Sequence, residues 1–247
     1  MGSFRSRTDA TLAKTTPGAS LIDAINLTKE LIRRPSVTPA DAGAMDIVET
    51  TLAGLGFACR RMRFGEIENL YARYGTESPN LCFAGHTDVV PVGDAAAWSQ
   101  GAFDAAVVDG VLIGRGAADM KSAIAAFAAA AAKAIAAGPI AGSLSFLITG
   151  DEEGVATHGT RMVVDALDLE DEVISHCVVG EPTSSAVFGD MIKIGRRGSI
   201  NVEITIQGVQ GHVAYPERLD NAIHRLSALI EALIREPIDK GSTHFQP

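Results

Sequence analysis

The sequence lacks the features of a secreted or membrane-spanning protein. It has three cysteines in 247 residues, widely spaced and with no Cys-x-x-Cys pair, which argues against a disulfide framework and against a thiolate metal site. The first eighteen residues contain no apolar signal core, and no uninterrupted apolar run reaches the roughly 18 residues that a membrane span needs. We therefore expect a cytoplasmic protein with a flexible N-terminal tail over residues 1–18.

Basic charge is also scarce. The chain carries 21 basic against 30 acidic side chains, which gives a formal net charge of -9. Nucleic acids and anionic membranes are bound by basic surfaces, so neither is expected as a partner. The apolar share of 47% is typical of a folded globular protein, and the excess of carboxylates leaves some of them available for binding cations.

Helical and strand-like patterns alternate through the first 180 residues. Helices are predicted over residues 21–33, with Ser20 as the N-cap, over 41–55, and over the alanine-rich stretch 119–137. This alternation predicts an α/β fold with a mostly parallel sheet flanked by helices. The apolar runs that we predict as strands are residues 69–74, 80–84, 111–113, 143–149 and 177–179.

The pattern changes near residue 195, where we place a domain boundary. Residues 199–207 alternate between apolar and polar side chains, as in a half-exposed strand, and residues 221–235 form an amphipathic helical pattern. The sequence thus predicts a larger domain over 19–195 and a smaller α+β domain over 196–247.

Polar residues gather directly after several predicted strands. They fall in four short segments, 85–88, 116–119, 151–153 and 180–182. In an open α/β sheet the loops beyond the carboxyl ends of the strands form the ligand crevice, so these segments are expected to converge. One imidazole among several carboxylates indicates a divalent metal site, with zinc the first choice and cobalt or manganese tolerated.

Each of these residues also has a purely structural interpretation. Asp119 opens a predicted helix, where an acidic N-cap is worth about 0.5–2 kcal/mol. Asp88 fits a turn, and the adjacent Glu152 and Glu153 fit a solvated loop. Glu181, which precedes a proline, also fits an ordinary loop position. Their shared position after strands favours the metal site.

The amino-acid sequences of these segments resemble those of the M20 family of metal-dependent amidohydrolases and peptidases. The resemblance runs from about residue 21 to the last residue, and two segments, Asp190–Ser199 and Gly208–Pro216, are similar to one biosynthetic branch of that family. It implies an aminopeptidase-like catalytic domain and a ferredoxin-like lid that pairs two subunits into a homodimer. The segments that match the metal motifs in order and spacing are His86–Pro91, Gly114–Ser122, Thr149–Gly154 and Gly180–Thr183.

The resemblance implies a ligand set for two zinc ions per subunit. Asp119 would bridge the two ions. His86 and Glu181 would complete one site, and Glu153 would belong to the other. Cobalt is expected as a possible replacement for zinc.

The other implied roles concern proton transfer and substrate binding. Glu152 would be the general base, and Asp88 would hydrogen-bond the far nitrogen of His86. His212 would reach from the lid of one subunit into the active site of the other and stabilise the oxyanion, although a histidine in this context is by itself more often structural. The residues implied to hold substrate carboxylates, with a solvated hinge as the alternative for both arginines, are Arg196, Arg197 and Ser199.

The implied reaction is hydrolysis of N-succinyl-LL-2,6-diaminopimelate to succinate and LL-2,6-diaminopimelate, a step of lysine biosynthesis. A related acylase, a deacetylase acting on acetylornithine or a carboxypeptidase of the same family is the first alternative. The second alternative is a chain that binds metal but is catalytically impaired. The family's second zinc takes a last histidine from a C-terminal segment, and the family's lid has four strands and two helices, so we expect this chain to be C-terminally incomplete.

Overall fold

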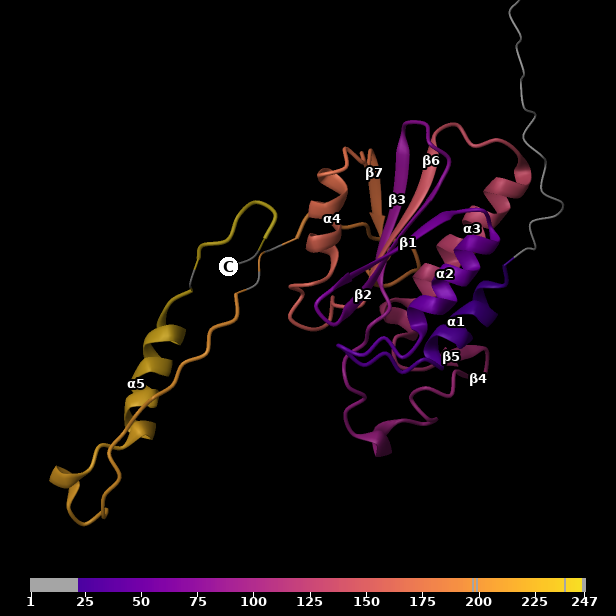
Figure 1. Cartoon of the computed structure of the whole chain (residues 1–247). Coiled ribbons are helices and arrows are strands. Elements are labelled where there is room, and N and C mark those ends of the chain that lie inside the picture. The colour runs from indigo at the N-terminus through magenta and orange to yellow at the C-terminus, as the bar shows by residue number, and fades with distance from the viewer. Residues whose placement is uncertain (1–21, 197, 199, 238, 246–247) are drawn as a thin grey trace, which may run out of the picture. The chain divides into compact units, whose positions relative to one another are not determined.

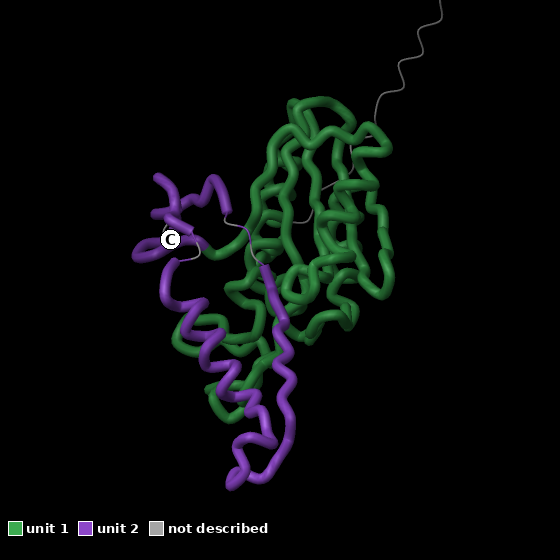
Figure 2. Tube along the Cα trace, turned by 90° about the vertical axis from the view of Figure 1, so that its left-hand side faces the viewer, with its two compact units in different colours: residues 1–182 green, residues 183–247 purple. Residues whose placement is uncertain are grey.

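The computed structural model describes residues 22–196, 198, 200–237 and 239–245. The chain divides into two compact units, residues 1–182 and 183–247 (Figure 2). This division falls earlier than the boundary expected near residue 195, and the tail expected over residues 1–18 lies outside the described residues.

The first unit is built on a five-stranded sheet with the spatial order β1-β2-β6-β3-β7 (Figure 1). The pairs β1–β2 and β2–β6 are antiparallel, whereas β6–β3 and β3–β7 are parallel. The sheet is therefore mixed, and the expectation of a mostly parallel sheet was wrong for its β1–β2 side. The strands are β1 (Ala58–Phe64), β2 (Ile67–Tyr74), β3 (Asn80–His86), β6 (Ser143–Thr149) and β7 (His176–Val179), and a separate hairpin joins β4 (Ala106–Val108) to β5 (Val111–Ile113).

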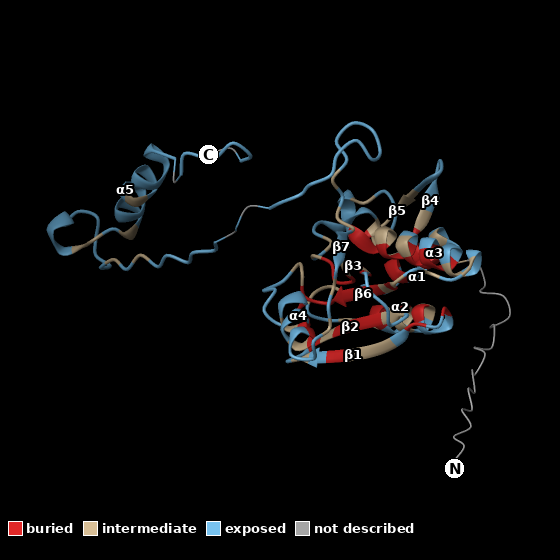
Figure 3. Cartoon of the chain, turned by 90° about the horizontal axis from the view of Figure 1, so that it is seen from above, coloured by how far each residue is buried: buried red, intermediate tan, exposed pale blue. Residues whose placement is uncertain are grey.

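Helices cover both faces of this sheet. Successive side chains of a strand point to opposite faces, so Phe146 and Ile148 of β6 join one hydrophobic cluster while Leu147 joins another. The first cluster includes side chains of α1 (Ala24–Ile32), α2 (Ala44–Gly54) and α3 (Ser122–Ala137), and the second includes α4 (Thr160–Asp168). Figure 3 shows the buried residues gathered along the sheet and these helices. The unit is a three-layer α/β/α structure.

Helix α3 is the alanine-rich helix that the sequence predicts. Small side chains, Ala125 and Ala128 among them, let it pack closely, and its buried positions also include Ile124. By length and composition alone, the segment Ala117–Ala137 is apolar enough to cross a membrane, which qualifies the expectation that no stretch would be. In the structure 44% of its most apolar window is buried, and Ile124, Ala125 and Ala128 belong to the first hydrophobic cluster.

The sequence pattern missed strands β1 and β4 and helix α4. Three of the seven residues of β1 are arginines, which conceal its apolar alternation. Arg61 pairs with Glu49 of α2, and Arg60 pairs with Glu170 just beyond α4, so the charged ends reach acids at the edge of the sheet. Helix α4 buries only Val163 and Leu167, which is too short a stripe to stand out in the sequence.

The second unit contains one long helix, α5 (Ala222–Arg235), as the sequence predicts. The side chain of Asn221 caps it by accepting a hydrogen bond from the Ile223 amide at 2.9 Å. Residues 200–207 form no strand, which corrects the expectation for the described part of 199–207. A strand needs a hydrogen-bonded neighbour, and the described residues of this unit provide none beside that segment. The partial ferredoxin-like lid stays a prediction.

Replacing Phe146 with alanine tests where the core lies. Phe146 is completely buried, and its ring lies 5.1–5.7 Å from the rings of Phe57, Phe83 and Phe127. Because the substitution leaves a cavity, we expect the free energy of unfolding in urea to fall by about 3–5 kcal/mol. Phe188 is fully exposed, so F188A, the same chemical change, should alter it by less than about 0.5 kcal/mol. Equal effects of F146A and F188A would contradict this core.

Candidate metal centre

Strand β3 lies between β6 and β7, and the connections on its two sides run over opposite faces of the sheet. From β3 the chain crosses through α3 to β6 on one side, and from β6 it returns through α4 to β7 on the other side of β3. Because α3 and α4 lie on opposite faces, the carboxyl ends of these strands are where an open α/β sheet binds its ligands. His86 is the last residue of β3 and is only 1% exposed, so the imidazole is buried at this end of the sheet.

Both ring nitrogens of His86 face oxygen atoms. Nδ1 donates a hydrogen bond to the carbonyl oxygen of Asp88 at 2.9 Å, which leaves a lone pair on Nε2 of the neutral ring. Nε2 lies 3.1 Å from Oδ1 of Asp119 and 3.5 Å from Oε1 of Glu181. A lone pair facing two carboxylates needs a cation or a proton between them.

The raised pKa of His86 agrees with this arrangement. Burial alone would lower the pKa of His86, but hydrogen bonds to Asp88 and the charges of Asp88 and Glu152 raise it to about 9. Without a metal ion, a proton therefore occupies the position on Nε2 where a cation fits. The donor set of one imidazole and two carboxylates suits zinc.

Asp119 does not cap the helix that follows it. Its backbone is extended (φ −118°, ψ 98°), and neither the turn from Ala117 to Lys121 nor α3 has a side-chain cap. The N-cap interpretation of Asp119 is therefore wrong. The side chain lies against His86 instead.

Negative charge is crowded around Asp119. His86, Asp119 and Glu181 each offer a ligand atom within 4.8 Å of the others, and they are the one such group among the described residues. Burial and the charge of Asp119 raise the pKa of Glu181, and the same two causes raise the pKa of Glu153. A divalent cation would relieve this repulsion. Glu153, expected at a second zinc, is not in the group.

The Asp88 side chain has a function that the sequence did not reveal. It is 2% exposed, and its carboxylate accepts hydrogen bonds from the amides of Glu152 at 3.1 Å and Glu153 at 3.0 Å. Its contact with His86 is closer through the carbonyl oxygen than through the carboxylate, which lies 3.5 Å from Nδ1. Asp88 thus joins the loop His86–Asp88, the histidine loop, to the turn Asp151–Glu153, the glutamate turn.

Glu152 lies beside the cluster without being part of it. Its Oε2 is 4.0 Å from Nε2 of His86, and its side chain is 36% exposed. The turn is held from inside by Asp151, which is 5% exposed and accepts hydrogen bonds from the amides of Ala156 and His158. Asp151 lies in one of the segments that were predicted to converge, but its role in holding the turn was not predicted.

The remaining predicted residues belong to the second unit. Arg197 and Ser199 lie outside the described residues, and Arg196 is exposed. His212 is exposed as well, and its Nδ1 accepts a hydrogen bond from the Ala214 amide at 3.0 Å. In the neutral ring the proton is then on Nε2, which makes that nitrogen a donor.

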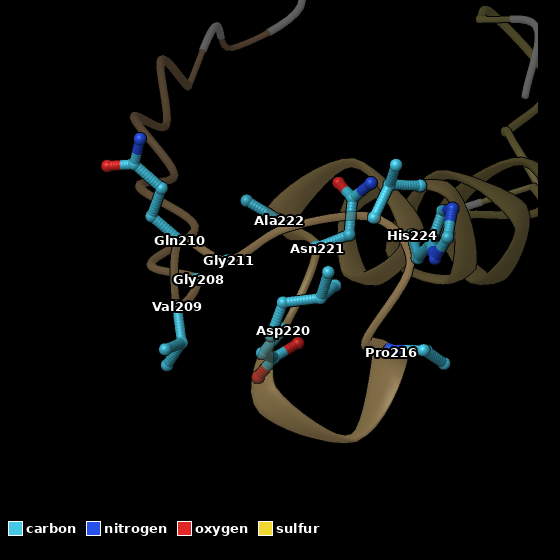
Figure 4. Close-up of a pocket in the computed structure, with 11 residues that line it drawn as sticks. Gly208, Val209, Gln210, Gly211, Pro216, Asp220, Asn221, Ala222 and His224 are labelled. Atoms are coloured by element: carbon cyan, nitrogen blue, oxygen red, sulfur yellow. The ribbon is translucent and has the colours of Figure 1, made fainter.

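The second unit also contains a pocket of about 510 Å³ (Figure 4). Residues 208–211 and 219–222 supply most of its lining, and none of the predicted site residues contributes to it. No described residue of this unit is buried, so this hollow lies on an open surface. The chemistry that we infer is at the end of β3 instead.

The sequence profile of Peptidase family M20/M25/M40 matches residues 82–246, and the chain belongs to this family. The matched range contains every residue of the metal cluster. The chain resembles a metallo-carboxypeptidase of the M20 family from Sulfolobus solfataricus, with a TM-score of 0.57 and 18% identity over 64% of this chain and 37% of that one. This likeness supports the fold.

Two curated relatives share much higher identity with the chain. It is 73% identical over 229 residues to a succinyl-diaminopimelate desuccinylase of Phenylobacterium zucineum, which covers 93% of this chain and 60% of that protein. It is 64% identical over 231 residues to one of Caulobacter vibrioides, with 94% and 59% covered. The chain thus spans about three fifths of the length of these relatives.

Removing the Asp88 carboxylate tests its hold on the glutamate turn. In D88A the amides of Glu152 and Glu153 lose a charged acceptor, and such a hydrogen bond is worth about 1.5–3 kcal/mol. We expect hydrogen exchange at these two amides to accelerate about tenfold or more, as measured by NMR or mass spectrometry. D94A, which removes the acceptor of the Ala96 amide at 2.9 Å, is the control and should leave residues 152–153 unchanged. Unaltered exchange in D88A would refute the assignment.

Proposed function

We propose that the protein is a metal-dependent amide hydrolase that cleaves N-succinyl-LL-2,6-diaminopimelate to succinate and LL-2,6-diaminopimelate. The observation that carries the proposal is the buried Nε2 of His86, which faces Asp119 and Glu181 with the free carboxylate of Glu152 4.0 Å away. The identities of 73% and 64% with proteins named succinyl-diaminopimelate desuccinylase support the choice of substrate.

The proposed cofactor is zinc, two ions per subunit, with cobalt as a possible replacement. His86, Asp119 and Glu181 would hold the first ion, and Asp119 and Glu153 would contribute to the second. When bound, such ions polarise a scissile carbonyl and lower the pKa of a shared water. Because only the first three residues already lie within ligand distance of one another, we expect the first ion to bind more tightly.

Glu152 is the proposed proton carrier. It would take a proton from the attacking water and deliver it to the departing amine of diaminopimelate, while the hydroxyl of that water stays on the succinyl carbon. Its amide is held by the Asp88 carboxylate, and its side chain is partly exposed beside His86, which allows contact with a substrate. Adjacent glutamates can thus divide the work, with Glu153 on the metal and Glu152 off it.

The second unit would supply the lid. Nε2 of the neutral His212 ring carries the proton, which suits donation to the oxyanion of the tetrahedral intermediate in a partner subunit. Arg196, Arg197 and Ser199 would bind the substrate carboxylates.

The proposed assembly is a cytoplasmic homodimer that pairs through the lid and acts on a small molecule. Helix α5 supports this pairing, because most of its apolar stripe is exposed in the described part of the second unit. Ile223 is 71% exposed, Leu233 51% and Ile230 46%. An apolar stripe of this kind favours a protein partner.

Changing Glu152 to glutamine tests the proposed reaction. The wild-type protein should hydrolyse N-succinyl-LL-2,6-diaminopimelate, and E152Q should lower kcat about 10²–10⁴-fold, with its zinc content unchanged, because the amide cannot accept the proton. E66Q, at an exposed glutamate of the β1–β2 turn, is the matched control and should keep full activity.

Two outcomes would count against the proposal in different ways. If E152Q retains a kcat close to that of the wild type, Glu152 is not the base. If the wild type prefers N-acetylornithine, the substrate is wrong and the deacetylase alternative holds. Both readouts use the protein loaded with zinc.

A further inference from the structure

Lys121 is a lysine buried beside the metal cluster. It is 0% exposed, and its Nζ donates three hydrogen bonds, to the carbonyls of Leu31 at 2.9 Å and Arg34 at 2.8 Å and to Oγ of Ser36 at 2.8 Å. An ammonium group has three N–H donors, so all of them are used, and none of the acceptors is a carboxylate. Burying a charge costs free energy unless every donor is paired, so the ammonium group is tolerated only where all three of its N–H groups have acceptors.

The acceptors of Lys121 lie at the C-terminal end of α1 and in the loop beyond it. The last carbonyls of a helix have no partner within the helix, and this end of the helix dipole attracts positive charge. The Leu31 carbonyl is one of these, and the chain leaves the helix at Arg33. Lys121 immediately precedes α3, so its side chain joins the start of that helix to the end of α1.

Ser36 extends this connection to the histidine loop. Its hydroxyl donates to the carbonyl of Thr87 at 2.7 Å, and its own carbonyl accepts from the Val89 amide at 3.0 Å. Thr87 lies between His86 and Asp88. A chain of two hydrogen bonds thus runs from the lysine ammonium to the backbone next to His86.

At its other end Lys121 closes the turn that carries Asp119. The Lys121 amide donates to the carbonyl of Gly116 at 2.9 Å, and Asp119 lies inside the turn. Gly116 has a φ of 79°, and a Cβ there would come within 2.8 Å of the Val89 side chain. The turn is therefore packed directly against the histidine loop.

We propose that Lys121 is a positioning residue of the metal centre. Through Ser36 its ammonium group sets the distance between the Asp119 turn and the His86–Asp88 loop, and hence the affinity for the metal ion. This inference rests on the proposed metal centre but not on the proposed substrate. Methionine at position 121 fills a similar volume but donates no hydrogen bond, so it isolates the role of the ammonium group.

The test is the affinity for Zn²⁺, measured by competition with a chelating indicator. Loss of groups that orient metal ligands commonly costs 10–100-fold in affinity, and we expect a loss in that range for K121M. S36A should weaken binding in the same direction by a smaller factor. The visible absorption spectrum of bound Co²⁺ should also change in K121M, because the ligand geometry changes. K133M, at an exposed lysine of α3, should match the wild type in both measurements.

A destabilised variant separates positioning from general loss of stability. L52A removes a fully buried side chain of α2 and should unfold more easily while it keeps its zinc affinity. The proposal is overturned if K121M binds Zn²⁺ as tightly as the wild type, or if L52A loses as much affinity as K121M. If K121M does not fold, S36A decides, and unchanged affinity in S36A overturns the proposal. A wild-type chain that binds no Zn²⁺ would instead refute the metal centre itself.

Discussion

The orientation of one buried imidazole governs the rest of this site. His86 lies at the carboxyl end of β3, which is flanked in the sheet by β6 and β7, and its Nδ1 is fixed by the carbonyl of Asp88. The other nitrogen is therefore directed at Asp119 and Glu181. Imidazole and carboxylate ligands at one point attract a divalent cation, and the fold supplies them from β3, from the turn before α3 and from the end of β7.

Two buried charged groups hold the loops that bring these ligands together. Asp88 binds the amides of the glutamate turn, and Lys121 binds the end of α1 and, through Ser36, the histidine loop. Their charges are opposite and they act on different loops, and each holds its loop through hydrogen bonds to backbone or hydroxyl groups. Because Asp88 and Lys121 hold the loops, the side chains of His86, Asp119 and Glu181 are not needed for that purpose and remain available to a metal ion.

Most of the first unit could be predicted from the sequence. The five strands and three helices predicted for this unit lie within a few residues of observed elements, because each has a strong apolar period or a clear end such as Gly138. The convergence of His86, Asp119 and Glu181 followed from their positions after strands. The direction of β2 and the presence of β1 could not be predicted, since pairing direction is set by contacts between distant segments and the arginines conceal the pattern of β1.

Other features depend on contacts that a linear pattern does not contain. Residues 200–207 alternate as a strand would, but alternation becomes a strand only beside a hydrogen-bonded neighbour. The functions of the Asp88 carboxylate and of Lys121 were also hidden, because their partners are amides and carbonyls, which every residue possesses.

X-ray absorption at the zinc edge of the loaded chain tests the central claim most directly. We predict a coordination shell of nitrogen and oxygen at about 2.0–2.2 Å, with the scattering of one imidazole that disappears in H86A. A sulfur shell at about 2.3 Å, or an imidazole signal that survives in H86A, would contradict a metal centre built on His86.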